Sequence, residues 1–442
     1  MTDPGPQPDG PDRRLAPRPL PLHLATAMNG WTSSRAAWPL LRNGSLSLAP
    51  EATMAAQSLQ DALDAASPPP GSPGPENPEN PDDDAFEHAV ESEIARRLAA
   101  LATGIRAYRD HPYRRALTDP PTVWRDGTTR LLDYGATSPT RRAAGAVPAR
   151  PVLFVPSLVN RAYILDLSAK RSLLRWLARD RTDGTALRPL LVDWDAPGAA
   201  ERDFDLTAYI DGRLGDALGA ARALDPLDRP VPVVGYCMGG LLALALALRR
   251  PDDTAALGLM ATPWHFHAER VAAAQAAAAA CRTAAPAIAA LGELPVDALQ
   301  SLFAVLDPFL VPRKFVAFAA LDPNSAKAAD FVALEDWLND GVGLAAAVAR
   351  ECIEGWYGDN APHRGLWRVG GMTVDPARWK GPALALIPQQ DRIVPPASAQ
   401  ALADALPQAT TLSPRLGHIG MVAGAAARDA VWRPLADWLH GL

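Results

Sequence analysis

The segment VVGYCMGGLL, residues 233–242, places a cysteine between two glycines where a strand-like run meets a helix-like run. A strand that ends in glycine–X–nucleophile–X–glycine and opens directly into a helix is a nucleophile elbow. Gly235 and Gly239 are the small residues that such a strained turn needs. The sequence therefore predicts that Cys237 is a nucleophile, and the alternative interpretation is a small buried cysteine.

The helix that follows Cys237 would place partial positive charge and free backbone N–H groups behind the sulfur atom. These groups favour a thiolate, and they would stabilise the oxyanion that forms during acyl transfer. We expect the N–H of Met238 to be one oxyanion donor. The second donor is expected from the loop after the apolar run VLFVP, at Leu158 or at its neighbour Ser157.

A thiolate needs a base, and the elbow fold orders its partners as nucleophile, acid and histidine. His418, in RLGHIGMVAG, lies in a short loop after the last expected strand, and Asp391, in QQDRIVPP, follows the strand-like GPALALIP. The aspartate would orient the histidine tautomer. A surface histidine and a turn-capping aspartate are the alternatives. His265 and His267 could line a pocket or bind metal, but no third ligand is suitably spaced, so we expect no metal site.

From residue 150 onward, short apolar runs alternate with helical ones. The expected strands are PVLFVPSL, LRPLLVDWD, VPVVGYC, TAALGLMAT, GPALALIPQQD and ATTLSP. This alternation predicts a mostly parallel α/β sheet with helices on both faces over residues 150–262 and 378–442. The mainly helical stretch 263–377 is expected to be an inserted cap, because so long a loop does not fit a compact domain.

The N-terminal part has a different composition. Residues 1–84 are expected to form a flexible extension that ends in the proline-rich linker SPPPGSPGPENPENPDDD. Residues 85–149 are expected to be a mainly helical segment, which begins with a long amphipathic helix and contains the short strand TTRLLDYG. The long helix either packs onto the α/β core or contacts a partner helix or an apolar granule.

Composition limits the classes of function. The 442 residues are 48% hydrophobic, enough for one large core or two modest ones. A net charge of −6 gives no electrostatic case for a nucleic-acid partner. Three widely spaced cysteines indicate neither a disulfide framework nor a zinc site, which fits a cytoplasmic protein. The N-terminus does not resemble a signal peptide, and no uninterrupted apolar run reaches the roughly 18 residues of a membrane span.

Seven segments of residues 150–442 together resemble the polyhydroxyalkanoate synthases, especially the short type that works with a second subunit. They are FVPSLVNRAYILDLS, LLVDWDAPG, GYCMGG, LEDWLNDG, GWYGDN, QQDRIVPP and GHIGMVAG. The resemblance implies an α/β-hydrolase fold in which Cys237, Asp391 and His418 are catalytic. It further implies transfer of a 3-hydroxyacyl group from coenzyme A to the cysteine and then to a growing polyester. In the first segment, the candidate substrate-loop residues are Ser157, Asn160 and Tyr163.

The same resemblance implies that the coenzyme A thioester is a substrate and that no cofactor is needed. The implied partners are a polyester granule, a second synthase subunit or a second copy of the chain. Two alternatives stay open. One is a hydrolase, thioesterase or depolymerase with the same three residues, similar to dienelactone hydrolase, and the other is a non-catalytic subunit that binds a granule or a synthase.

Overall fold

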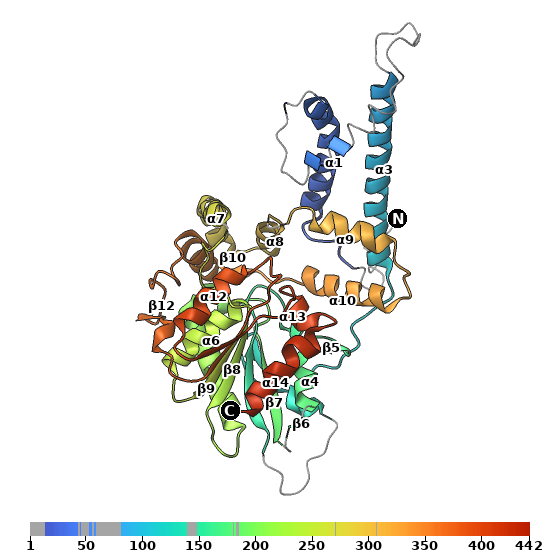
Figure 1. The fold of residues 1–442 in the computed structure, drawn as a ribbon. Helices are drawn as coiled ribbons and strands as arrows, with labels where there is room; N and C mark the ends of the chain where they lie inside the picture. Colours follow the sequence, from blue (N-terminus) through green and yellow to red (C-terminus); the bar gives the residue numbers. More distant parts are fainter. Residues whose placement is uncertain are drawn as a thin grey trace, which may run out of the picture. The chain divides into compact units, whose positions relative to one another are not determined.

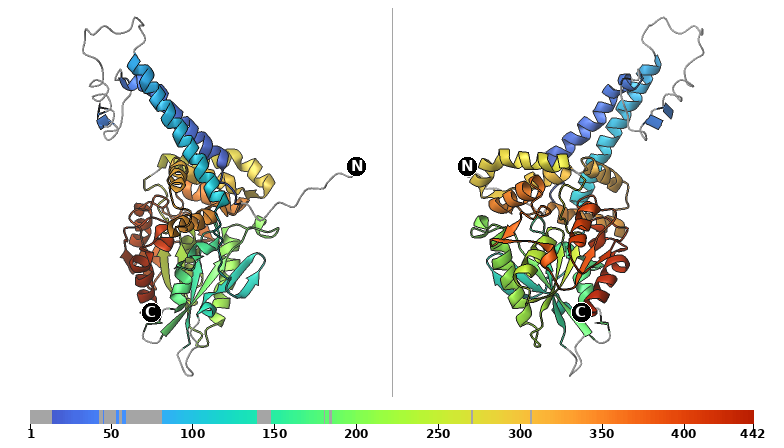
Figure 2. Two further views of the ribbon diagram at one scale, coloured as in Figure 1. Left: turned by 90° about the vertical axis from the view of Figure 1, so that its right-hand side faces the viewer. Right: turned by 60° about the vertical axis from the view of Figure 1, so that its left-hand side comes forward.

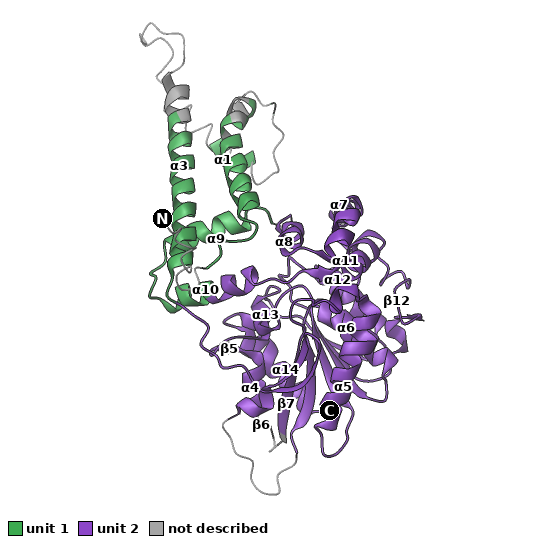
Figure 3. Cartoon of the chain, turned by 180° about the vertical axis from the view of Figure 1, so that it is seen from behind, with its two compact units in different colours: residues 1–112, 307–332 green, residues 113–306, 333–442 purple. Residues whose placement is uncertain are grey.

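The computed structural model describes residues 14–42, 45, 53–54, 57–58, 81–138, 148–179, 181–182, 185–269, 271–305 and 307–442. The chain forms two compact units, which Figure 3 colours separately. Unit 1 contains residues 1–112 and 307–332, and unit 2 contains residues 113–306 and 333–442.

A nine-stranded sheet organises the described part of unit 2, in the order β1–β2–β7–β3–β8–β9–β14–β15, with β6 paired to β7. The strands are β1 Thr122–Asp126, β2 Thr129–Asp133, β3 Arg150–Val155, β6 Arg181–Thr182, β7 Thr185–Asp193, β8 Val231–Tyr236, β9 Thr254–Met260, β14 Ala383–Leu386 and β15 Ala409–Leu412. Neighbours from β7 to β15 are parallel, whereas β1, β2 and β6 pair antiparallel. The predicted α/β-hydrolase sheet is confirmed.

Helices cover both faces of this sheet (Figure 1). They include α4 Leu173–Arg179, α5 Gly215–Ala223, α6 Met238–Arg249, α12 Pro396–Ala405, α13 Gly420–Ala423 and α14 Arg433–His440. Alternate residues of β3 point to opposite sides, because side chains alternate along a strand. Leu153 and Val155 belong to the core that includes α5 and α6, while Val152 and Phe154 belong to the core that includes α4 and α14. All six residues of β8 are buried, as expected for a central parallel strand.

The edge of the sheet beyond β7 differs from the sequence prediction. Residues 85–149 were expected to be a mainly helical segment with one short strand, but two strands, β1 and β2, form a hairpin that extends the sheet. Leu131 and Leu132 of β2 are buried and pair antiparallel with β7. Burial of these two leucine side chains stabilises the hairpin in the sheet.

The stretch between β9 and β14 is mainly helical, as the sequence predicts. It contains α7 Val271–Leu291, α8 Val296–Ala304, α9 Leu310–Ala319, α10 Ala326–Asn339, α11 Ala346–Arg350, the π-helix η5 Glu351–Gly358 and the short strands β10 Glu293–Leu294, β11 Leu344–Ala345, β12 Arg368–Val369 and β13 Met372–Thr373. The sequence predicts that residues 263–377 form one inserted cap. In the structure, residues 307–332 instead group with unit 1.

Unit 1 contains α1 Leu20–Arg42, α3 Pro81–Asp110, α9 and the first part of α10. Helices α1 and α3 lie side by side (Figure 2). The close approach of α3 and α9 needs Gly104, because a Cβ there would lie 2.0 Å from the Phe315 carbonyl oxygen. Helix α3 begins at Pro81, inside the predicted linker, since proline is tolerated in a first helical turn. Residues 59–80 lie outside the described part of the chain. None of the described helices is long and apolar enough to span a membrane.

Candidate active site

Cys237 stands between the last residue of β8 and the first residue of α6, with φ 55° and ψ −128°. A positive φ is strained for a residue with a Cβ, so the surrounding structure must hold it in place. The Cys237 N–H donates to the Met260 carbonyl oxygen at 2.8 Å, and the Cys237 carbonyl accepts from the Gly240 N–H at 2.9 Å. This geometry is the strained strand-to-helix turn that the sequence predicts.

Three glycines around the cysteine allow backbone segments to approach closely. A Cβ on Gly235 would lie 2.4 Å from the Gly240 Cα, and a Cβ on Gly239 would lie 2.0 Å from the Val155 carbonyl oxygen. A Cβ on Gly240 would lie 1.9 Å from the Thr262 hydroxyl oxygen. The motif-based prediction named Gly235 and Gly239 but did not include Gly240 among the site residues.

Asp391 and His418 form a buried pair in the loops that follow β14 and β15. The His418 Nδ1 donates to Asp391 Oδ2 at 2.6 Å. The other carboxylate oxygen, Oδ1, accepts the N–H groups of Ile393 at 2.8 Å and Val394 at 2.9 Å. These bonds orient the carboxylate, which in turn places the His418 proton on Nδ1 and leaves Nε2 as the available ring nitrogen.

Cys237 lies close enough to His418 for the two side chains to interact electrostatically. Burial lowers the pKa of His418, but negative charge on Cys237 and the hydrogen bonds to Asp391 and Cys237 outweigh burial and raise this pKa to about 10. The imidazole is therefore suited to keep a proton beside a thiolate. The Tyr236 ring packs against the His418 ring with the centroids 5.1 Å apart, and the Tyr236 hydroxyl donates to the His418 carbonyl oxygen at 3.2 Å. The structure thus brings together the three residues that the sequence singles out.

The two expected oxyanion donors belong to the same buried core. Met238 is the first residue of α6, and Leu158 lies in the loop after β3; both are buried. The Trp194 indole N–H donates to the Pro156 carbonyl at 3.1 Å and holds the start of this loop. The Ser157 hydroxyl accepts the N–H of the residue two positions later at 3.1 Å, so it stabilises the turn itself. The roles of Met238 and Leu158 as oxyanion donors stay a prediction.

The other two substrate-loop candidates are held by neighbours. Asn160 forms an isolated antiparallel bridge with Gly341. Burial, together with negative charge on Asp340, raises the pKa of the Tyr163 hydroxyl. The Arg115 guanidinium lies over the Tyr163 ring, 5.3 Å from its centroid. Tyr163 therefore fixes the loop through its own contacts.

The histidines after β9 form a local network. The rings of His265 and His363 stack with their centroids 3.9 Å apart. Asn360 Nδ2 donates to His265 Nδ1 at 3.1 Å, and His267 Nε2 donates to the Tyr357 carbonyl oxygen at 2.7 Å. Burial, and then the two neighbouring histidines, lower the pKa of His265. Within the described ranges, no group of three or more His, Cys, Asp or Glu residues could hold a metal ion.

Tyr357, in the π-helix η5, lies beside the residues that follow β9. Its ring packs edge-on against Phe266 at 4.8 Å, and 37% of the residue stays exposed. Burial raises the pKa of its phenol, as does negative charge on Cys237.

Comparison with known proteins identifies the fold class of the chain. The family model of the alpha/beta hydrolase fold matches residues 150–424, so the chain is an α/β-hydrolase-fold protein. A solved esterase structure from Thermogutta terrifontis is similar over 73% of this chain and 98% of that chain, at 19% identity and a TM-score of 0.42. A second family model, the N-terminus of poly-beta-hydroxybutyrate polymerase (PhaC), matches residues 114–177.

Three curated relatives carry the name poly(3-hydroxyalkanoate) polymerase subunit PhaC. The Synechocystis sp. relative is 31% identical, with 65% of this chain and 77% of the relative covered. The Allochromatium vinosum relative is 30% identical, with 68% and 83% covered. The Haloarcula marismortui relative is 27% identical, with 73% and 67% covered. The chain belongs to the PhaC family.

Proposed function

We propose that this protein is an acyltransferase that moves 3-hydroxyacyl groups from coenzyme A to Cys237 and then to a growing polyester. The observation that carries the proposal is the strained turn at Cys237, within reach of the buried His418–Asp391 pair. Membership of the PhaC family supports the substrate class, because the relatives are named poly(3-hydroxyalkanoate) polymerase subunits.

In the first step, His418 takes the proton of Cys237, and the thiolate attacks the carbonyl carbon of the coenzyme A thioester. The N–H groups of Met238 and Leu158 stabilise the oxyanion that forms. The bond between the acyl carbon and the coenzyme A sulfur then breaks, and the leaving thiolate takes the proton from His418. Asp391 stabilises the intermediate imidazolium. The products are free coenzyme A and an acyl thioester on Cys237.

In the second step, the hydroxyl of another 3-hydroxyacyl unit attacks the thioester on Cys237. His418 accepts the hydroxyl proton, an ester bond forms, and the bond between the acyl carbon and the sulfur breaks. The Cys237 thiolate then recovers its proton from His418. A cysteine suits this cycle, since a thioester exchanges readily with a thiolate and stays activated for the next hydroxyl. In both steps the protons move between His418, Cys237, the substrate hydroxyl and the coenzyme A sulfur, so the proposed reaction uses no cofactor. The coenzyme A thioester is a substrate.

The proposal extends to partners and location. The relatives' name includes the word subunit, which supports the proposal that this protein acts together with a second synthase subunit. The polyester product would be an apolar phase, so we also propose that the protein acts at the surface of a granule inside the cell.

Product analysis tests the proposal. The purified full-length chain is incubated with 3-hydroxybutyryl-coenzyme A, alone and with the second subunit of a relative, while thiol release and products are measured. Polymer or protein-bound oligomers are expected, and Cys237→Ala is expected to abolish them. Release of free 3-hydroxybutyrate without polymer would instead identify a hydrolase. Absence of thiol release with short and long acyl chains would favour a non-catalytic subunit.

A further inference from the structure

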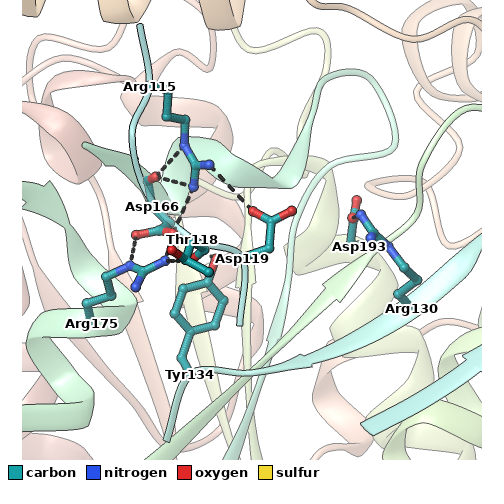
Figure 4. Close-up of polar contacts among 8 residues, drawn as sticks. All are labelled: Arg115, Thr118, Asp119, Arg130, Tyr134, Asp166, Arg175 and Asp193. Carbon is teal, nitrogen blue, oxygen red and sulfur yellow. Dashed lines mark hydrogen bonds and ion pairs between the residues drawn. The ribbon is translucent and has the colours of Figure 1, made fainter. Parts of the chain in front are cut away.

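A fully buried carboxylate, Asp166, lies at the far end of the loop that follows β3, where it begins β4 Asp166–Ser168 (Figure 4). Arg175 of α4 donates from Nε to Asp166 Oδ1 at 2.8 Å and from Nη2 to Oδ2 at 2.9 Å. The same Oδ2 accepts from Arg115 Nη2 at 2.9 Å and from the Tyr134 hydroxyl at 3.1 Å. Every oxygen of this buried carboxylate is therefore satisfied by charged or polar donors.

Arg115 binds this loop in three ways. It donates to the Asp166 carboxylate and, from Nε at 3.3 Å and Nη2 at 3.1 Å, to the Asp166 backbone carbonyl. It also covers the ring of Tyr163 within the loop. Arg175 extends the cluster to the segment of Arg115, because its Nη2 donates to the Thr118 carbonyl at 2.7 Å. The cluster thus connects residues 115–118 to the end of the loop.

The loop has a second anchor at its start. The Pro156 carbonyl, directly after β3, accepts the Trp194 indole N–H, and the Cα of Gly239 packs against the same backbone. Leu158, the expected oxyanion donor, lies between this anchor and Asp166. Oxyanion donors stabilise a transition state only when they are already in position, so the rigidity of both anchors affects the rate.

We propose that Arg115 is a positioning residue for acyl transfer, which fixes the loop that carries Leu158 by holding Asp166 and Tyr163. This inference rests on the proposed function. Loosening the far anchor would misplace the donor in the transition state and would leave substrate binding largely intact. The expected signature is therefore a fall in kcat with little change in KM.

The test compares Arg115→Lys with Arg188→Lys in the full-length chain. Lysine keeps the charge at position 115, but a single ammonium group does not reproduce the planar set of donors that reaches both carboxylate and carbonyl. Arg188 is a matched control. Its side chain is 27% exposed, against 24% for Arg115, and it donates from Nε and Nη2 to Asp133 at 3.1 and 2.7 Å. Arg188 pairs with Pro151, at the opposite end of β3 from the loop.

For Arg115→Lys, the kcat of coenzyme A release is expected to fall about tenfold or more while KM changes less than about twofold. Arg188→Lys is expected to change both constants less than about twofold. Unchanged kcat in Arg115→Lys, or an equal loss in both variants, would overturn the positioning role. If Arg115→Lys does not fold, Tyr134→Phe removes one hydrogen bond to Asp166 and keeps the ring; its kcat is then expected to fall about two- to threefold.

A second readout separates this inference from the proposed function. The burst of p-nitrophenol from p-nitrophenyl butyrate reports acylation of Cys237 without any coenzyme A substrate. If the wild type shows the burst but releases no coenzyme A, the proposed substrate is wrong. The burst rates of Arg115→Lys and Arg188→Lys then still decide the positioning role, because the ester forms the same oxyanion.

Discussion

Substitution of Gly239 by alanine tests the packing that creates the turn at Cys237. The new Cβ would lie 2.0 Å from the Val155 carbonyl oxygen and 2.7 Å from the Pro156 carbonyl oxygen. Both are backbone atoms, so no side-chain rotation relieves the clash, and the Pro156 carbonyl is also held by Trp194. We expect Gly239→Ala to lower the free energy of unfolding by about 3 kcal/mol, the upper part of the usual range for overpacking. Acylation of Cys237 should slow as well, since the displaced backbone begins the loop of Leu158.

Urea denaturation followed by circular dichroism measures the change, and Gly219→Ala provides the matched control. Gly219 lies inside α5, and a Cβ there would meet nothing within 4 Å. Alanine is the better helix former by about 1 kcal/mol, so this variant should be slightly more stable than the wild type. A Gly239→Ala protein within about 0.5 kcal/mol of the wild type would refute the reasoning, because a distance of 2.0 Å would then not describe the packing.

Three further predictions concern Cys237 and the buried His418–Asp391 pair. Negative charge on Cys237 raises the pKa of His418, so Cys237→Ala should lower this pKa from about 10 in histidine-labelled NMR titrations, and an unchanged value would contradict the contact. Because the folded pKa exceeds the unfolded value of 6.5, the contribution of His418 to stability is complete below pH 6.5 and is lost as the pH rises through about 10. The difference in unfolding free energy between wild type and His418→Gln should shrink across that window. Asp391→Asn keeps an acceptor for the loop N–H groups but sets an amide NH₂ against His418 Nδ1, which favours the wrong tautomer. It should slow acylation by about 10²–10⁴-fold, and a rate within tenfold of wild type would reassign the acid.

The parts of the site that the sequence predicted are those that depend on local pattern. The glycines around Cys237 are adjacent in the chain, and the strand before them is continuously apolar, so the turn follows from one short segment. Asp391 and His418 were singled out because each follows an apolar strand in the order that the fold requires. The parallel sheet was predicted for the same reason, since its strands read as short apolar runs.

The parts that were missed depend on contacts between distant segments. Arg115 and Asp166 are 51 residues apart, and nothing in either local sequence indicates their pairing. Strand β1 has mostly exposed residues, so its short polar sequence lacks the alternation that predicts a strand. The grouping of residues 307–332 with unit 1 likewise arises from packing between remote helices.

The most direct test of the central claim is the intact mass of the protein after rapid mixing with 3-hydroxybutyryl-coenzyme A, followed by peptide mapping. The account predicts an increase by one or more 3-hydroxybutyryl units, located on the peptide that contains Cys237 and absent from Cys237→Ala. Coenzyme A release that continues unchanged in Cys237→Ala, or acyl groups found on another residue, would contradict the assignment of Cys237 as the nucleophile.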